Sequence, residues 1–91
     1  MYLHLGSESV VRTDEIIGIF DLENSTIAKS TKNYLAKAQK MGWVVNVTDD
    51  IPKSFVICQA GEHHPPRVYI TQISSQTLKK RCSFINDISN V

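Results

Sequence analysis

One segment of the chain places its apolar side chains at the spacing of an α-helix, whereas the apolar residues around it form short, β-branched runs. Within residues 24–41, apolar and small side chains recur three or four positions apart, so they share one helix face. That face consists of Ile27, Thr31, Tyr34, Leu35, Ala38 and Met41. Asn24 or Ser25 can cap the first turn, and Gly42 suits the left-handed residue that ends a helix. A single amphipathic helix needs an apolar surface to pack against, and the short runs predict that this surface is a β-sheet.

Short strands are predicted before this helix. Residues 2–5 and 9–12 have strand-like composition on either side of a turn. Thr13 is expected to cap a single helical turn, with two acidic residues at its positive end. The apolar run of residues 16–20 indicates a central strand covered on both faces, and Gly18 within this run indicates a bulge or a close approach of another backbone.

Further strands and a second helix are predicted after it. Residues 43–48, 54–58 and 68–71 have strand composition, and the prolines of the loop 60–66 separate the last two. The second helix is expected to bury one face and to begin at a serine cap; these residues are Ser74 or Ser75, then Leu78, Cys82, Ile85 and Ile88. This order predicts an α+β fold with a small, mostly antiparallel sheet, packed by one long helix plus a C-terminal helix, in a single domain of residues 1–91.

The size and composition of the chain limit what such a domain can do alone. A chain of 91 residues buries roughly 60–65% of its unfolded surface, and small domains often hide further apolar surface by association, so we expect a homo-oligomer. No apolar run approaches the roughly 18 residues of a membrane span, and no signal peptide is expected at the start. Two cysteines do not make a disulfide framework, which favours a reducing, cytoplasmic location.

No motif for catalysis or metal binding emerges from the sequence. His63 and His64 are adjacent, and neighbouring side chains of an extended segment point to opposite sides, so a shared metal ion is not expected. The cysteines lack zinc-ligand spacing, the glycines are scattered singly, and no nucleophile motif is present. We therefore expect no enzyme activity, cofactor or small-molecule substrate.

The charges are distributed unevenly although the formal net charge is only +1. Residues 24–48 contain basic but no acidic side chains, as do residues 76–86, whereas four acids crowd into residues 14–23. Lysines on a helix are most often an ordinary solvated face. They can also contact nucleic-acid phosphates, or meet the acidic surface of a neighbouring subunit. The candidate DNA-phosphate contacts are Lys29, Lys32, Lys37, Lys40 and Lys53.

Three segments in order resemble a known family. Residues 2–6, residues 10–21 and residues 75–81, with sequences YLHLG, VVRTDEIIGIFD and SQTLKKR, resemble the extracellular-matrix regulators of Gram-positive bacteria, and above all their RemB-like branch. The resemblance implies a small DNA-associated transcription regulator of biofilm-matrix genes, with a fold similar to the LytTR type of DNA-binding domain. The related RemA-like branch forms rings that bind DNA, so the resemblance also implies a ring-forming homo-oligomer and DNA as a partner.

The chain departs from the RemA-like branch where that branch contacts DNA. Paired arginines of that branch correspond here to the stretch Asp49-Asp50-Ile51-Pro52, a further basic position corresponds to Glu15, and the loop 61–66 is longer than in the RemB-like branch. Two hypotheses therefore remain. The first is an oligomeric regulator that binds DNA phosphates through its basic surfaces. The second is a protein–protein interaction module that regulates the same process without touching DNA.

Overall fold

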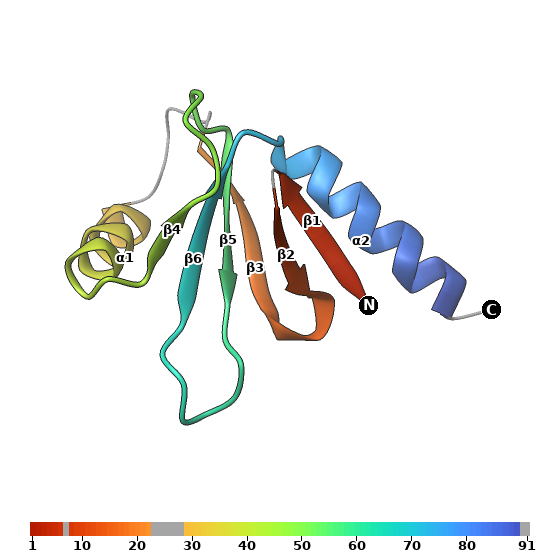
Figure 1. Ribbon diagram of the computed structural model, residues 1–91, viewed down its shortest axis with the longest axis horizontal. Helices are drawn as coiled ribbons and strands as arrows, with labels where there is room; N and C mark the ends of the chain where they lie inside the picture. The colour runs from red at the N-terminus through yellow and green to blue at the C-terminus, as the bar shows by residue number, and fades with distance from the viewer. Residues whose placement is uncertain (7, 23–28, 90–91) are drawn as a thin grey trace.

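The computed structural model describes residues 1–6, 8–22 and 29–89, and of residues 83–89 only the backbone. Two sheets and two helices make up this part of the chain (Figure 1). In order, the elements are β1 (Tyr2–Gly6), β2 (Ser9–Arg12), the 3-10 turn η1 (Thr13–Glu15), β3 (Ile16–Asp21), α1 (Lys29–Lys40), β4 (Val44–Asn46), β5 (Ser54–Cys58), β6 (Arg67–Thr71) and α2 (Ser75–Ser89). The predicted α+β class is therefore confirmed, and neither of these helices is long and apolar enough to cross a membrane.

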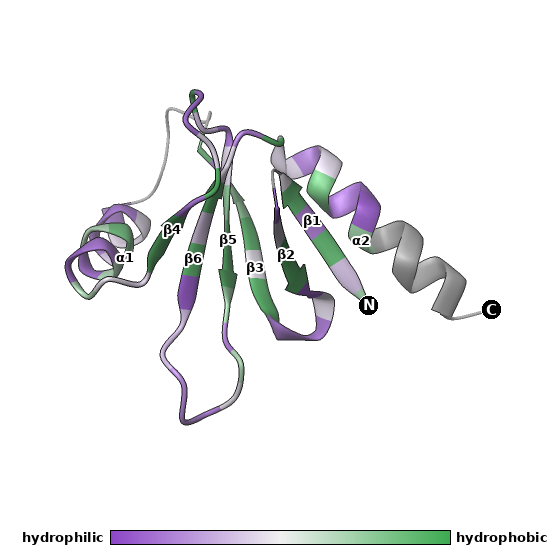
Figure 2. Ribbon diagram, viewed as in Figure 1, coloured by the Kyte–Doolittle hydropathy of each residue, from purple (hydrophilic) through white to green (hydrophobic). Residues whose placement is uncertain are grey.

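The larger sheet has the strand order β3-β5-β6-β4, so β5 and β6 lie inside it. The pairs β3–β5 and β5–β6 are antiparallel, and β4 joins β6 in parallel. Because side chains alternate along a strand, Phe55 and Val56 of β5 point into different core clusters on opposite faces of this sheet. Figure 2 shows hydrophobic residues concentrated along the strands of this sheet and hydrophilic residues on the helices and loops.

The prediction that residues 16–20 form a central strand is wrong, because β3 lies at the edge of the sheet. Ile17 is 61% exposed and Phe20 is 38% exposed. The predicted bulge at Gly18 is confirmed, since the register with β5 shifts between Ile16 and Gly18. A Cβ atom at Gly18 would lie 2.6 Å from the ring of Phe20, which stacks on Phe55 with ring centroids 4.9 Å apart. Residues 16–20 and 54–58 are both short apolar runs. The second run forms the inner strand β5, and the first forms the edge strand β3.

Helix α1 packs on one face of this sheet through the predicted side chains. Ala38 is fully buried against Phe55 and Val68, with Tyr34 and Leu35 beside them. The amides of Gly42 and Trp43 donate to the carbonyls of Gln39 and Ala38, and Gly42 has a φ of +76°, which together make a Schellman turn.

Other predictions for this helix have different outcomes. Met41 was expected on the buried face but is 57% exposed, because the helix ends at Lys40 and Met41 belongs to the turn. The predicted caps Asn24 and Ser25, and the predicted face residue Ile27, lie outside the described residues.

The opposite face of the sheet is covered by the hairpin β1–β2 and by α2. Leu3, Leu5 and Val11 of the hairpin pack with Val56 and Leu78 in a second core cluster. Among the strands that the structure describes, β1 and β2 pair only with each other. The mostly antiparallel arrangement is therefore confirmed, but it is divided between two sheets rather than one.

The ends of two elements on this side were also predicted. Ser74 caps α2, since its hydroxyl oxygen accepts from the amide of Thr77 at 3.2 Å, as predicted. The predicted cap at Thr13 is wrong: Arg12 occupies the cap position of the 3-10 turn without a side-chain bond. The Thr13 hydroxyl instead donates to the carbonyl of Met1.

Candidate nucleic-acid interface

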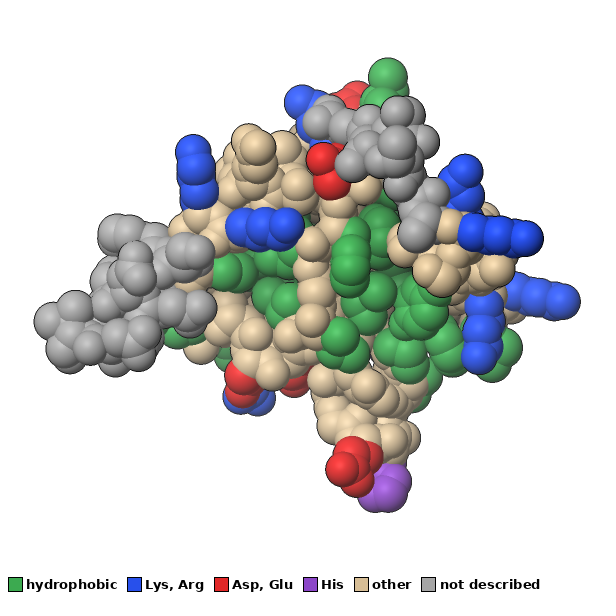
Figure 3. Space-filling view, turned by 180° about the vertical axis from the view of Figure 1, so that it is seen from behind, with side chains coloured by type: hydrophobic (Ala, Val, Ile, Leu, Met, Phe, Trp, Pro, Cys, Tyr) green, Lys and Arg blue, Asp and Glu red, His purple; other side chains and the backbone are tan. Residues whose placement is uncertain are grey.

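Four of the five predicted DNA contacts share helix α1. Lys29, Lys32, Lys37 and Lys40 are all exposed, whereas the opposite side of the helix carries the buried Ala38. The segment from Lys29 to Lys40 contains no acidic residue, so nothing within the helix neutralises these charges. Figure 3 shows basic side chains gathered at the end of the molecule that α1 forms. We call these four residues the lysine face.

Lys53 lies on a separate segment, directly before β5. Its backbone is held between two strands, because its amide donates to the carbonyl of Thr71 and its carbonyl accepts from the amide of Leu22, both at 2.9 Å. The Lys53 side chain is exposed. The structure thus gathers the lysine face on one helix, whereas Lys53 lies in another segment, directly before β5.

A second basic cluster lies on α2 and is absent from the predicted contacts. Lys79, Lys80 and Arg81 are exposed, and Arg81 reaches back to the carbonyl of His4 at 3.4 Å. Helices α1 and α2 stand at opposite ends of the molecule (Figure 1), so the two basic clusters face different directions. The sequence signal was the same for both clusters, namely basic residues without acids nearby.

The turn after β4 carries negative charge and an apolar tip. Asp49 and Asp50 are exposed, and Ile51 is 85% exposed, which is unusual for so large an apolar side chain. The turn is ordered by Thr48, whose hydroxyl oxygen accepts from the amide of Asp50 and donates to the side-chain oxygen of Gln72 at 2.8 Å. This surface repels phosphates and suits a basic protein partner.

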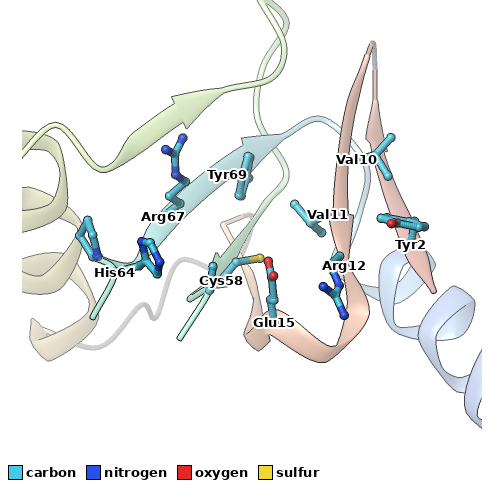
Figure 4. Close-up of a pocket in the computed structure, with 11 residues that line it drawn as sticks. Tyr2, Val10, Val11, Arg12, Glu15, Cys58, His64, Arg67 and Tyr69 are labelled. Carbon is cyan, nitrogen blue, oxygen red and sulfur yellow. The ribbon is translucent and has the colours of Figure 1, made fainter. Parts of the chain in front are cut away.

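A crevice between the hairpin and β6 brings together charged and aromatic side chains (Figure 4). Arg12, Arg67 and Tyr69 line it, and Glu15 and Cys58 lie at its centre. Burial, and secondly the negative charge of Glu15, raises the pKa of the Cys58 thiol from 9.0 to about 11. The thiol therefore stays protonated at neutral pH and is a poor nucleophile.

The pKa of the second cysteine thiol is raised as well. Cys82 of α2 is half-buried, and burial raises the pKa of its thiol as well. Both cysteines are free, so the sulfur atoms contribute to packing and not to a cross-link.

Comparison with known proteins places the chain in a family. Residues 2–82 match the model of a family described as RemA-like, extracellular matrix regulatory protein A-like. The chain is also 34% identical over 90 residues to the extracellular matrix regulatory protein B of Bacillus subtilis (strain 168). That alignment covers 99% of this chain and 100% of the relative. Because both matches extend over nearly the whole chain, the resemblance of the three sequence segments is confirmed, and this chain belongs to the RemA-like family.

Proposed function

We propose that this protein is a cytoplasmic transcription regulator of extracellular-matrix (biofilm) genes, and that it acts by binding and not by catalysis. The name of its Bacillus subtilis relative supports the regulatory role. As part of the proposal, the fold is of the LytTR DNA-binding type and the protein works as a homo-oligomer, with a ring as the arrangement.

The observation that carries DNA binding is the lysine face of α1. Four cations on one exposed helix face, without an acidic residue between them, can neutralise neighbouring phosphates and release the counterions that surround DNA. Such contacts fix the position of a protein on the duplex without reading its sequence.

Association of several copies has two physical supports. In the described part of the chain, the sheet divides the core into two small clusters, and small domains often cover further apolar surface by association. Large apolar side chains also remain exposed; they are Met1, Tyr2, Val10, Ile17, Phe20, Met41 and Ile51. Several lysine faces in one assembly would bind DNA more tightly than one face alone.

Fluorescence anisotropy with a labelled duplex tests this proposal. The wild-type chain is expected to bind at low salt and to release the duplex as salt rises. Lys37→Glu/Lys40→Glu removes two contacts and adds two repulsive charges, so this variant is expected to lose binding. Lys79→Glu/Lys80→Glu, with the same charge change on α2, is the matched control and keeps it. No binding by the wild-type chain at low salt would refute the proposal.

The exposed acidic turn favours a second candidate function. Asp49 and Asp50 directly precede the exposed Ile51, so this turn can dock on a basic protein surface that has an apolar hollow. Under this alternative, light scattering gives one defined oligomer whose mass does not change when DNA is added. A monomer at high concentration would contradict both candidates, and a mass that rises with added duplex favours the first.

A further inference from the structure

Strand β3 forms one edge of the four-stranded sheet, and the described residues place no strand on its outer side. From Ile16 to Phe20 the strand carries no charged side chain, and both Ile17 and Phe20 are exposed. Proteins usually protect an open edge with charged residues, proline or a bulge, because such a strand pairs readily with another chain. The bulge between Ile16 and Gly18 interrupts only the first half of β3, so the second half keeps a regular, open edge.

The backbone amide and carbonyl of Ile19 point toward this open side. In an antiparallel pair, residues that exchange backbone hydrogen bonds alternate with residues that do not. The amide of Leu22 donates to the carbonyl of Lys53 at 2.9 Å, which marks a bonded position. Ile19 lies three positions before Leu22 in the same register, opposite Val56, so it occupies a position that is not bonded to β5. Ile19 therefore offers one donor and one acceptor to a strand on the outer side.

Hollows lie beside β3 on both faces of the sheet. The hollow on the α1 side is mostly apolar; it is lined by Phe20, Ser30, Thr31, Tyr34, Phe55 and Ile57. The hollow on the other side lies between β3 and α2; it is lined by Thr13, Asp14, Ile16, Gly18, Ile19, Lys79 and Cys82. Because side chains alternate along a strand, a strand added to β3 would direct its side chains to the two hollows in turn. Open backbone groups between two hollows are the features of a strand-addition site.

We propose that β3 pairs with β3 of a second copy of this chain, antiparallel and about a two-fold axis at Ile19. The proposal rests on the homo-oligomer of the proposed function and names one of its contacts. The amide of each Ile19 donates to the carbonyl of the other, and Phe20 stands opposite Gly18 of the partner subunit. A Cβ atom at Gly18 would lie 2.6 Å from the ring of Phe20, so each ring leans over Gly18 toward the axis. The two exposed rings therefore cover each other in the pair.

The composition of β3 favours a copy of itself as the added strand. Like charges directly opposite each other destabilise a strand pair, and β3 brings none to its middle. Asp21 lies at the end of the strand, so antiparallel pairing keeps the two acidic side chains at opposite ends of the contact. A two-fold contact is self-complementary, so the apolar edges of both copies are covered in one step. The other edge strand, β4, has only three residues and ends at the exposed Asn46, so it would cover less of β3.

Hydrogen–deuterium exchange of the full chain, resolved to single amides by NMR, tests this contact. At high protein concentration the amide of Ile19 is expected to exchange about tenfold or more slowly than in dilute solution, because the second copy supplies its acceptor. Ile17→Lys, at an exposed position of the edge, is expected to weaken association about tenfold or more in sedimentation equilibrium, since lysine on an edge strand opposes pairing. Ile51→Lys makes the same change at an exposed position of the acidic turn and is expected to leave association unchanged.

Equal exchange of the Ile19 amide at both concentrations would overturn the contact, even in an oligomeric protein, because the copies would then meet elsewhere. Equal association of the wild type and Ile17→Lys would overturn it as well, once circular dichroism has established that the variant is folded. Slow exchange at Ile19 and at Asn46 together would replace the two-fold contact by a head-to-tail pairing of β3 with β4.

These outcomes are separate from those for the lysine face. A wild-type chain that binds duplex but leaves the Ile19 amide unprotected would refute the β3 contact and retain the DNA proposal. Protection of Ile19 in a chain that does not bind duplex would refute the DNA proposal and support the contact.

Discussion

Helix α1 and the hairpin β1–β2 cover opposite faces of one four-stranded sheet, but they are attached to it differently. On the hairpin side, the buried hydroxyl of Thr71 donates to the carbonyl of Leu5, and the Ser54 hydroxyl donates to the carbonyl of Ile73 at 2.6 Å. On the α1 side, no side-chain hydrogen bond joins the helix to the sheet within the described residues, and contact is apolar. As far as the structure describes the chain, the hairpin side therefore combines packing with directional bonds, whereas α1 contacts the sheet through apolar side chains.

The two faces of the sheet are therefore expected to have different roles, the hairpin side in stability and the α1 side in binding. Hydrogen bonds between buried groups fix one arrangement, because breaking them leaves polar atoms without partners. A helix attached by a narrow apolar stripe can present a full row of cations without burying them, as the lysine face does. We therefore expect substitutions on the hairpin side to act on stability, and substitutions on the outer face of α1 to act on binding.

The largest effect is expected from truncating the hairpin-side core. Leu78 is fully buried in α2, and Leu78→Ala is expected to lower the free energy of unfolding by about 3 kcal/mol. The matched change on the other face, Leu35→Ala at a half-buried position, is expected to cost about half as much, roughly 1.5 kcal/mol. Urea unfolding measures both values. Equal losses would show that the two faces contribute alike.

The directional bond of the hairpin side comes next. Thr71→Val keeps the side-chain volume but leaves the carbonyl of Leu5 without this donor, so we expect a loss of about 2 kcal/mol in urea unfolding. Thr48→Val removes a hydroxyl whose bonds are exposed to solvent, and it is expected to cost less than about 1 kcal/mol. If the two variants were equally stable, the buried bond would not hold the hairpin.

Alkaline pH is expected to weaken the same side of the molecule. The pKa of Cys58 is raised from 9.0 to about 11 in the folded chain by burial and by Glu15. Between these values the unfolded chain has lost a proton that the folded chain retains, so stability falls as pH rises from about 9 to 11. Comparing urea unfolding at pH 8 and pH 10 should give a steeper loss for the wild type than for Cys58→Ala. Parallel losses in the two proteins would rule out Cys58 as the cause.

The smallest change concerns the end of α1. Gly42→Ala puts a side chain at a φ of +76°, with open space around it, so only the backbone preference opposes the change. A loss of about 1 kcal/mol is expected from thermal unfolding, whereas Ala36→Ser at an exposed position of the same helix should cost no more than roughly 0.5 kcal/mol. A neutral Gly42→Ala would mean that the Schellman turn does not determine where α1 ends.

Local patterns predicted much of this fold. The bounds of β5 at residues 54–58, the stop at Gly42 and a serine cap for α2 follow from the conformational preferences of single residues or short runs. For the cap, Ser74 and Ser75 were both candidates, and for Gly18 a bulge was one of two predicted roles. The placement of whole strands does not. The run of residues 16–20 resembles β5 in composition, and only the sheet as a whole determines which of them lies at the centre.

For the candidate sites too, local features could be predicted from the sequence and tertiary placement could not. Helical spacing was enough to place the lysine face on one exposed side of α1. The crevice could not be foreseen, because the residues that line it come from both sheets and are brought to one surface only by the packing of the hairpin. Tertiary contacts of this kind are not accompanied by any regular spacing of residues that could be recognised in the sequence.

The salt dependence of duplex binding tests the role of the lysine face most directly. Each lysine–phosphate contact adds about 0.9 to the slope of log affinity against log salt concentration. Replacing Lys37 and Lys40 by glutamine is therefore expected to reduce the magnitude of that slope by about 2, whereas the same change at Lys79 and Lys80 leaves it as in the wild type. An unchanged slope in the α1 variant would contradict the account, because the cations of α1 would then not touch DNA.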